Sequence, residues 1–472
     1  MIVPILFETS TIEDDSPLFS WIFYMFVSKM SSNSNMVVIG QENFFKNLSK
    51  KKKNGMSLHL KELFDCTFPT TSLIKKCNKY MITNEELLSI VNEYEDSYES
   101  EKSLIVNFNQ KLYSIIQDRI ESIENDFEEH VDNIIVWVNN ETINQYAKKH
   151  HINVINMELS SIRKNGYNMN LMYFCPDKYS VDYCKKMYYE FLKYDNIPIL
   201  SRREILSLFI SSDCLKSAFH YDSFSHFEIG ISPGLKKDFF FDLYSNESIQ
   251  STFKKVKHFF NDSSVSIRFH PGYQWNLKKY NFIIDDSRNS VEWILKCKRI
   301  VTSVSNVGFE AMLLGRTVYI LSDCMPYSFV ANNCLDYIDD SIVDIRFINF
   351  MVFVFFVPLS LATDSQYILW RNTKPPILEI YLRHIKTIKK ELGIKEKLTL
   401  NNILKKVHHL NQDAICKLCN DTDYNRYKML LTNNVQLTQQ CKELSNEISN
   451  VLNSRSWKIT KPLRTISKKI KK

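Results

Sequence analysis

A histidine and a proline stand directly after one of the clearest strand patterns in the chain. The run 265–269 (VSIRF) is rich in β-branched and aromatic residues, and His270 and Pro271 follow it. Because proline fixes the turn, the imidazole is held at the carboxyl edge of the strand, where open α/β sheets bind their ligands. A histidine at that edge can donate a hydrogen bond to a phosphate oxygen.

A serine-rich turn joins the next predicted strand to a helix. Residues 303–311 read SVSNVGFEA, and the second serine or the asparagine can cap the helix that follows. Free N–H groups and the dipole at a helix start attract anions, and the glycine lets the backbone approach a ligand closely. With the histidine of the preceding unit, this turn predicts a nucleotide-phosphate site. Its candidate residues are Ser303, Ser305, Asn306, Gly308 and Glu310.

Carboxylates follow two further strands. The run 227–231 leads into 232–238 (SPGLKKD), which ends in Asp238. A carboxylate just past a strand end can act as a nucleophile or a base, and it can equally cap a helix or remain a surface charge. Glu158 and Arg163 follow the strand at 152–157, and these residue types suit acid–base work and carboxylate binding. An exposed Glu–Arg pair is the structural alternative.

Alternating strands and helices position these residues. We predict strands at 36–40, 134–138, 152–157, 227–231, 265–269, 299–302 and 317–321, and helices at 84–123, 141–150, 246–260, 290–297 and 305–314. This alternation predicts an α/β fold with parallel sheets covered on both faces. A break near 200–221 divides it into two domains, at 1–205 and 206–395, with a cleft between them.

Composition limits the class of protein. With 472 residues, of which 44% are hydrophobic and 24% charged, the chain is expected to fold as a soluble protein of several domains. The longest apolar run, 350–362, is shorter than the ~20 residues that span a bilayer, and predicts a buried strand or helix. The first residues lack the basic flank of a signal peptide, so we expect a cytoplasmic protein. The eleven cysteines are expected to be reduced.

The C-terminal part has a different pattern. Apolar residues in steps of three and four predict a coiled coil at 429–454, which would give a homo-oligomer or hold a partner, after a helical connector at 396–428. The tail, 455–472, carries eight bases and no acid, whereas the rest of the chain is nearly neutral, which argues against nucleic-acid binding. Bases interleaved with apolar residues suit an anionic membrane surface, the alternative being a solvated end. The candidates for membrane association are Trp457, Lys458, Arg464, Lys468 and Lys469.

Several motifs occur together in one order between residues 84 and 384. They are 137–140 (WVNN), 158–163 (ELSSIR), 171–174 (LMYF), His270-Pro271, 303–315 (SVSNVGFEAMLLG), 353–358 (FVFFVP) and 371–384 (RNTKPPILEIYLRH). This series resembles the retaining β-Kdo transferases of glycosyltransferase family 99 and their capsule-pathway relatives. Residues 456–464 (SWKITKPLR) also look like a segment that follows a coiled coil in many polysaccharide glycosyltransferases.

The resemblance implies a GT-B-like fold, in which two Rossmann-type domains face each other across a cleft. The N-terminal domain would hold the acceptor, and the C-terminal domain would hold a CMP-activated sugar through His270 and the serine-bearing helix start. Asp238 aligns with the family's aspartate nucleophile. The family's glutamine and one of its paired acids are missing here, so Asp242 and Asp222 remain alternatives and loss of activity is a further reading.

The implied reaction moves Kdo, or a related 2-keto-3-deoxy sugar acid, from CMP to a growing bacterial surface polysaccharide, O-antigen or capsule. Configuration would be retained through an aspartyl-glycosyl intermediate, without a metal or cofactor. Glu158 would be the base for the acceptor, and Arg163 would pair with the sugar carboxylate. The acceptor would be a lipid-linked glycan at the inner face of the inner membrane. Two alternatives are an inverting CMP-sialic-acid-type transferase and a catalytically inactive scaffold of polysaccharide assembly.

Overall fold

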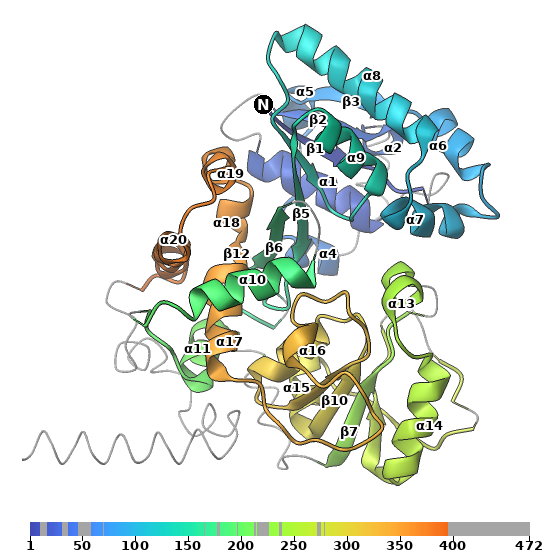
Figure 1. Ribbon diagram of the computed structural model, residues 1–472, viewed down its shortest axis with the longest axis vertical. Helices are drawn as coiled ribbons and strands as arrows, with labels where there is room; N and C mark the ends of the chain where they lie inside the picture. Colours follow the sequence, from blue (N-terminus) through green and yellow to red (C-terminus); the bar gives the residue numbers. More distant parts are fainter. Residues whose placement is uncertain are drawn as a thin grey trace, which may run out of the picture. The chain divides into compact units, whose positions relative to one another are not determined.

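The protein contains two β-sheets with helices on both faces of each (Figure 1). The computed structural model describes residues 1–9, 17–30, 36–45, 58–68, 70–164, 166–176, 180–195, 197–211, 214, 226–235, 238–270, 275–277 and 279–394. The predicted connector, coiled coil and basic tail lie outside these residues, and so do Pro271 and Asp222.

The first sheet has seven strands in the order β12-β6-β5-β4-β1-β2-β3. Their bounds are β1 Ile2–Leu6, β2 Val37–Gln41, β3 Asn78–Ile82, β4 Asn133–Val136, β5 Asn153–Leu159, β6 Leu171–Pro176 and β12 Val357–Pro358. Strands β1 to β5 are parallel, but β6 runs antiparallel to both β5 and β12. The expectation of a wholly parallel sheet was therefore wrong here. The connection from β5 to β6 contains no helix and is too short for the crossover that a parallel pair requires.

Alternate residues of the first sheet pack against two separate groups of helices. Val3 and Ile5 of β1 share a core with one group, whereas Leu6 belongs to the core of the other. The first group comprises α6 (Asn84–Val91), α7 (Ser97–Val106), α8 (Gln110–Phe127) and α9 (Glu141–Lys149). The second includes α1 (Pro17–Met30), α4 (Leu58–Leu63), α5 (Thr71–Lys75), α18 (Leu359–Ala362) and α19 (Ser365–Asn372). Both faces of this sheet are thus covered, as the sequence predicts.

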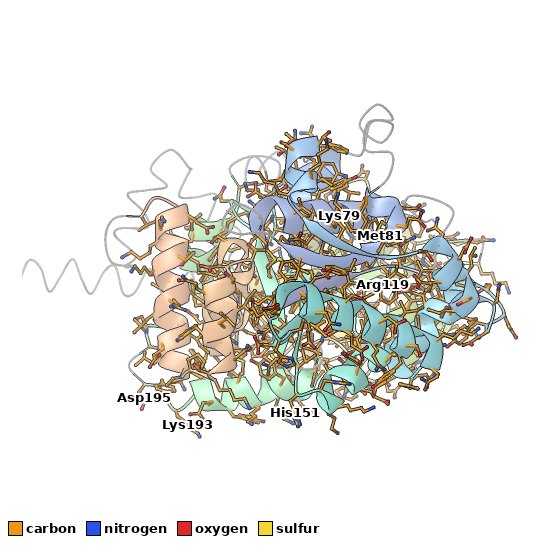
Figure 2. The ribbon with its side chains drawn as sticks, turned by 90° about the horizontal axis from the view of Figure 1, so that it is seen from above. Lys79, Met81, Arg119, His151, Lys193 and Asp195 are labelled. Atoms are coloured by element: carbon orange, nitrogen blue, oxygen red, sulfur yellow. The ribbon has the colours of Figure 1, made fainter. Side chains whose placement is uncertain are left out.

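Helix α8 is hydrogen-bonded to the edge strand β3. Arg119 of α8 lies beside Met81 of β3 in Figure 2, and its Nε donates to the Met81 carbonyl over 2.9 Å. The Tyr80 hydroxyl of the same strand donates to Asp126 over 2.6 Å. These bonds give the outermost strand partners on the helix as well as on β2.

The second sheet has five parallel strands in the order β11-β10-β7-β8-β9. Their bounds are β7 Phe227–Ser232, β8 Val265–Ile267, β9 Ile283–Ile284, β10 Cys297–Thr302 and β11 Thr317–Ile320. Helix α14 (Ile249–Phe259) covers one face, and α15 (Ser290–Lys296) and α16 (Val307–Leu313) cover the other. A Cβ at Gly230 would lie 2.7 Å from Trp293, so only glycine lets α15 pack this closely on β7.

The chain passes from one sheet to the other and then returns. Helices α10 (Val181–Phe191) and α11 (Arg202–Phe209) precede the second sheet, and α13 (Phe239–Tyr244) follows β7. After β11 the chain forms α17 (Ile345–Phe350), a π-helical turn (Met351–Phe355) and β12, and it ends in α18, α19 and α20 (Ile377–Glu391). The apolar run 350–362 is largely buried in these elements, as expected. The predicted range 206–395 for the second domain therefore contains elements that pack on the first sheet.

Candidate active site

The turn before α16 contacts the loop that follows β5. The Ser161 hydroxyl donates to the Asn306 carbonyl over 2.8 Å, and the Tyr173 hydroxyl donates to Asn306 Oδ1 over 3.0 Å. Asn306 Nδ2 in turn donates to the Leu159 carbonyl over 3.2 Å. Both ends of the Asn306 amide are thus engaged with the first α/β unit. This residue was predicted to bind the donor, but its side chain joins the two units.

Two candidate residues of α16 itself, Glu310 and Gly308, contribute to packing. Glu310 of α16 is buried and accepts a hydrogen bond from the Tyr167 hydroxyl over 3.1 Å. A Cβ at Gly308 would lie 2.6 Å from Ile320 of β11, so the glycine permits contact between helix and strand. Ser303 is buried, and Ser305 is half-buried with its Oγ accepting from the Val307 N–H over 3.3 Å. Because the Ser305 hydroxyl accepts in this bond, its own O–H can still act as a donor.

Glu158 lies near the carboxyl end of β5, opposite Tyr173 of β6. The pKa of its carboxyl is raised to about 7, mainly by burial; the positive charge of Arg163 opposes the rise, and the negative charge of Asp238 adds to it. A carboxylate of the second α/β unit thus affects the ionisation of one in the first. A pKa near neutrality suits a group that must both accept and release a proton.

Asp238 is the N-cap of α13. Its Oδ1 accepts from the N–H groups of Phe240 and Phe241 over 3.0 and 3.1 Å. Burial raises the pKa of this carboxyl, and the two N–H donors oppose the rise. Asp238 therefore caps a helix, as one of the alternatives from the sequence predicted. The cap engages only one of its two carboxylate oxygens. Within the described residues, Oδ2 has no hydrogen-bond partner.

The rival carboxylate Asp242 is already engaged elsewhere. It lies exposed on α13, and its Oδ2 accepts from the Tyr98 hydroxyl of α7 over 2.8 Å. The rings of Tyr98 and Phe239 also stack with 4.7 Å between their centroids. These contacts connect α13 to the first α/β unit and engage one oxygen of Asp242.

The positive charge of Arg163 acts on three of the predicted site residues. Its positive charge lowers the pKa values of Glu158, Glu310 and His270, although burial has the larger effect on each of them. For His270 both effects lower the pKa, so the imidazole is neutral at pH 7. These residues come from three strand ends: Glu158 and Arg163 from that of β5, Asp238 from that of β7 and His270 from that of β8.

A cavity of about 630 Å³ lies at the carboxyl ends of strands from both sheets, and its described lining includes none of Glu158, Arg163, Asp238 and His270. Asn139 follows β4 and Cys324 follows β11, and Phe240 of α13 and Asp182 of α10 also line it. Burial raises the pKa of the Cys324 thiol to about 12, and the charges of Asp238 and Glu158 contribute to the rise. The cavity therefore lies near Asp238, to which the N–H of the lining residue Phe240 donates, and its size is that of a small-molecule site.

Sequence reasoning missed several residues of this cavity. Asn139, Asp323 and Cys324 stand just past predicted strands, so the strand-end rule used for His270 would have found them. Ser180 and Asp182 start α10 and gave no such signal, because only the tertiary fold brings that helix to the cavity.

One sequence comparison bears directly on the first α/β unit. Residues 6–177 match the model of the Glycosyltransferase 99 family N-terminal domain. This segment resembles that family. The matched segment contains Glu158 and Arg163, and it extends further toward the N-terminus than the motifs alone indicated. Asp238, His270 and the α16 turn lie beyond it. No curated protein sequence matches the chain.

Solved structures with some likeness include enzymes that act on activated sugars. KpsC of Thermosulfurimonas dismutans, a beta Kdo 2,7 transferase, is 14% identical over 51% of this chain and 82% of its own, with a TM-score of 0.35. The beta Kdo 2,4 transferase of the same protein is 11% identical over 53% and 90%, with a TM-score of 0.31. The UDP-GlcNAc 2-epimerase of Methanocaldococcus jannaschii is 13% identical over 70% and 86%, with a TM-score of 0.30. At these scores the likenesses carry no argument.

The described residues contain neither a cluster of metal-binding side chains nor a membrane-spanning helix. In the part of the chain that the structure describes, no three His, Cys, Asp or Glu side chains gather as metal ligands would. Among the described helices, none combines the length and apolar composition needed to cross a bilayer. The eight cysteines in the described residues are all unpaired, as expected for reduced thiols.

Proposed function

We propose that this chain is a retaining glycosyltransferase that moves Kdo, or a related 2-keto-3-deoxy sugar acid, from a CMP donor to a bacterial surface polysaccharide. The observation that carries the proposal is the electrostatic coupling of Glu158 with Arg163 and Asp238, near a cavity that is lined by Phe240, whose N–H donates to Asp238. The family match of residues 6–177 supports the reaction class. In this proposal the two α/β units are the Rossmann-type domains of a GT-B enzyme.

Asp238 would begin the reaction with its unoccupied oxygen. Oδ2 attacks the anomeric carbon from the face opposite CMP, the bond from that carbon to the phosphate oxygen breaks, and its electron pair leaves with CMP. The N–H groups of Phe240 and Phe241 hold Oδ1 and so orient the carboxylate. The neutral imidazole of His270 would donate to the departing phosphate, and Ser303 and Ser305 would add hydroxyl donors.

Glu158 would complete the reaction as the base. It takes the proton of the acceptor hydroxyl, whose oxygen then displaces Asp238 from the anomeric carbon. Two inversions give overall retention. A pKa of about 7 leaves a substantial fraction of Glu158 ionised at neutral pH. Arg163 would pair with the carboxylate of the sugar acid. Its positive charge already acts on both Glu158 and His270.

Mass spectrometry of the intact full-length protein tests this proposal. We expect incubation with CMP-Kdo to add one Kdo residue, most abundantly in Glu158→Gln, since loss of the base slows removal of the intermediate. Asp238→Asn should lose the adduct, whereas the matched Asp242→Asn should keep it. Turnover without an adduct in any of these variants would favour single displacement, as in a sialyltransferase. Absence of donor cleavage by the wild-type protein would favour the scaffold.

A further inference from the structure

Arg371 of α19 is a buried cation with neutral partners. It is 5% exposed, its Nη1 donates to the Tyr367 hydroxyl over 3.1 Å, and its Nη2 donates to the Tyr183 hydroxyl over 3.2 Å. The guanidinium also lies 5.4 Å from the centroid of the Phe174 ring. Hydroxyls and aromatic faces solvate a cation but do not neutralise its charge.

The charge of Arg371 has no counterion within the described residues. No carboxylate lies within ion-pair distance of it there, and the neighbouring His384 contacts Tyr367 over 2.6 Å. Burial lowers the pKa of His384 far below its ordinary value, so this ring is neutral and adds no charge of either sign. A buried charge without a counterion is costly, and an anion that reaches it would relieve that cost.

A cavity of about 690 Å³ opens beside Arg371, between α10, α19 and α20. Tyr183, Lys186 and Lys374 also line it, and its acidic lining residue Glu190 is paired over 2.6 Å with Lys193, labelled in Figure 2. Tyr183 accepts from Arg371, and no acceptor for its own O–H is found within the described residues, so the hydroxyl can donate to a ligand. The polar groups of this cavity therefore present a net positive charge.

The remainder of the lining is apolar. Ile155, Met187 and Ile380 are buried side chains that line the cavity. Asn153 and Val154, at the amino end of β5, also line it, whereas Glu158 lies toward the carboxyl end of the same strand. This cavity is thus separate from the one beside the candidate carboxylates.

We propose that the cavity between α10, α19 and α20 binds an organic phosphate that carries an apolar portion. Arg371 and Lys186 neutralise the phosphate, Tyr183 donates a hydrogen bond to it, and the apolar portion lies against Ile155, Met187 and Ile380. The proposal does not depend on the transfer reaction, because the site shares no residue with the candidate active site. A cavity of this size accommodates a small amphiphile.

Isothermal titration calorimetry of the full-length protein with monooctyl phosphate tests the proposal. We expect saturable binding at one site, at least tenfold tighter than that of inorganic phosphate, because each buried methylene adds favourable free energy. Neutral octyl glucoside should bind at least tenfold more weakly than octyl phosphate. If inorganic phosphate binds as tightly as octyl phosphate, the claim that the cavity binds an apolar portion is wrong. If octyl glucoside binds as tightly as octyl phosphate, the claim of an anion site is wrong.

Three variants locate the binding. Tyr183→Phe should weaken octyl phosphate binding roughly tenfold or more, since a hydrogen bond to a charged group is lost. Lys186→Glu should weaken it roughly threefold to tenfold, whereas Lys185→Glu, the exposed neighbour outside the cavity, should change it less than twofold. Equal losses in the two lysine variants, or none in Tyr183→Phe, would overturn the assignment. Unchanged melting temperatures without ligand verify folding.

Discussion

Glu158 and Asp238 are two carboxylates whose surroundings differ, and this difference allows them separate tasks. Asp238 has two N–H donors on one oxygen, which favour its ionised form against the effect of burial. For Glu158, no N–H donor offsets burial in this way, and only the positive charge of Arg163 opposes the rise of its pKa. In the proposed reaction, the acid that accepts two N–H bonds is the nucleophile, and the acid with a pKa near neutrality is the base.

The pKa of Glu158 predicts a pH dependence of the reaction. If Glu158 must be ionised to act, the acceptor-transfer rate should rise through about pH 7 and level off above it. Glu158→Gln should abolish that rise and lower the rate roughly a hundredfold or more. Initial rates between pH 5 and 9 check this. A wild-type rate that does not change between pH 6 and 8 would argue against Glu158 as the base.

The same group predicts a pH dependence of stability. Because folding raises the pKa of Glu158 from 4.5 to about 7, the folded state binds more protons than the unfolded state between these values. The free energy of unfolding should then fall as pH rises through this window, by about 3 kcal/mol from this group. Urea denaturation at pH 5 and 7.5 measures it. Glu158→Gln should show a correspondingly smaller fall, and an equal fall in both proteins would contradict the prediction.

At the scale of elements, the contact between the β5–β6 loop and the start of α16 holds the candidate residues together. Loss of the Asn306 side chain would leave the buried Leu159 carbonyl and the Tyr173 hydroxyl without this partner. We expect Asn306→Ala to lower the free energy of unfolding by about 2–4 kcal/mol and Tyr173→Phe by about 1 kcal/mol. Urea denaturation measures both changes.

An exposed tyrosine provides the control for these substitutions. Tyr337 is 62% exposed, so Tyr337→Phe should change the free energy of unfolding by less than about 0.5 kcal/mol. If Tyr173→Phe behaves like Tyr337→Phe, the contact with α16 contributes little to stability.

The elements differ in how far sequence could predict them. Strand β4 and helix α9 appear within about two residues of their predicted ends, because β-branched runs and amphipathic spacing are local signals. Helix α1 was missed because its residues 19–27 are buried throughout and are apolar or aromatic except for Ser20, which gives no periodic pattern. The direction of β6 depends on a loop without a helix, and the use of Asn306 depends on residues some 130–147 positions away. Neither is encoded in local spacing.

At the scale of the whole described molecule, two sets of contacts join the two α/β units. Asn306 makes one set, and the Tyr98 contacts with Asp242 and Phe239 make the other. Since Asp238 starts the helix that Tyr98 holds, the second contact bears on the position of the proposed nucleophile.

Removal of the Tyr98 side chain should loosen α13. In Tyr98→Ala, we expect amide hydrogens of residues 239–244 to exchange at least tenfold faster than in the wild type, because both the hydrogen bond and the ring stack are lost. Hydrogen exchange followed by mass spectrometry measures this, and Tyr337→Ala serves as the exposed control. Unchanged exchange in 239–244 would mean that the second α/β unit alone holds the helix.

The return of the chain to the first sheet has a consequence for synthesis. Strand β12 pairs with β6, and α18 and α19 complete the core beneath it, yet these elements are made only after the whole second sheet. On the ribosome, the second sheet can finish folding while the first still exposes the bare edge of β6 and an uncovered apolar surface. A nascent chain in that state is open to wrong pairing, so chaperone dependence during translation should begin at the first sheet and end when residues up to 372 have emerged.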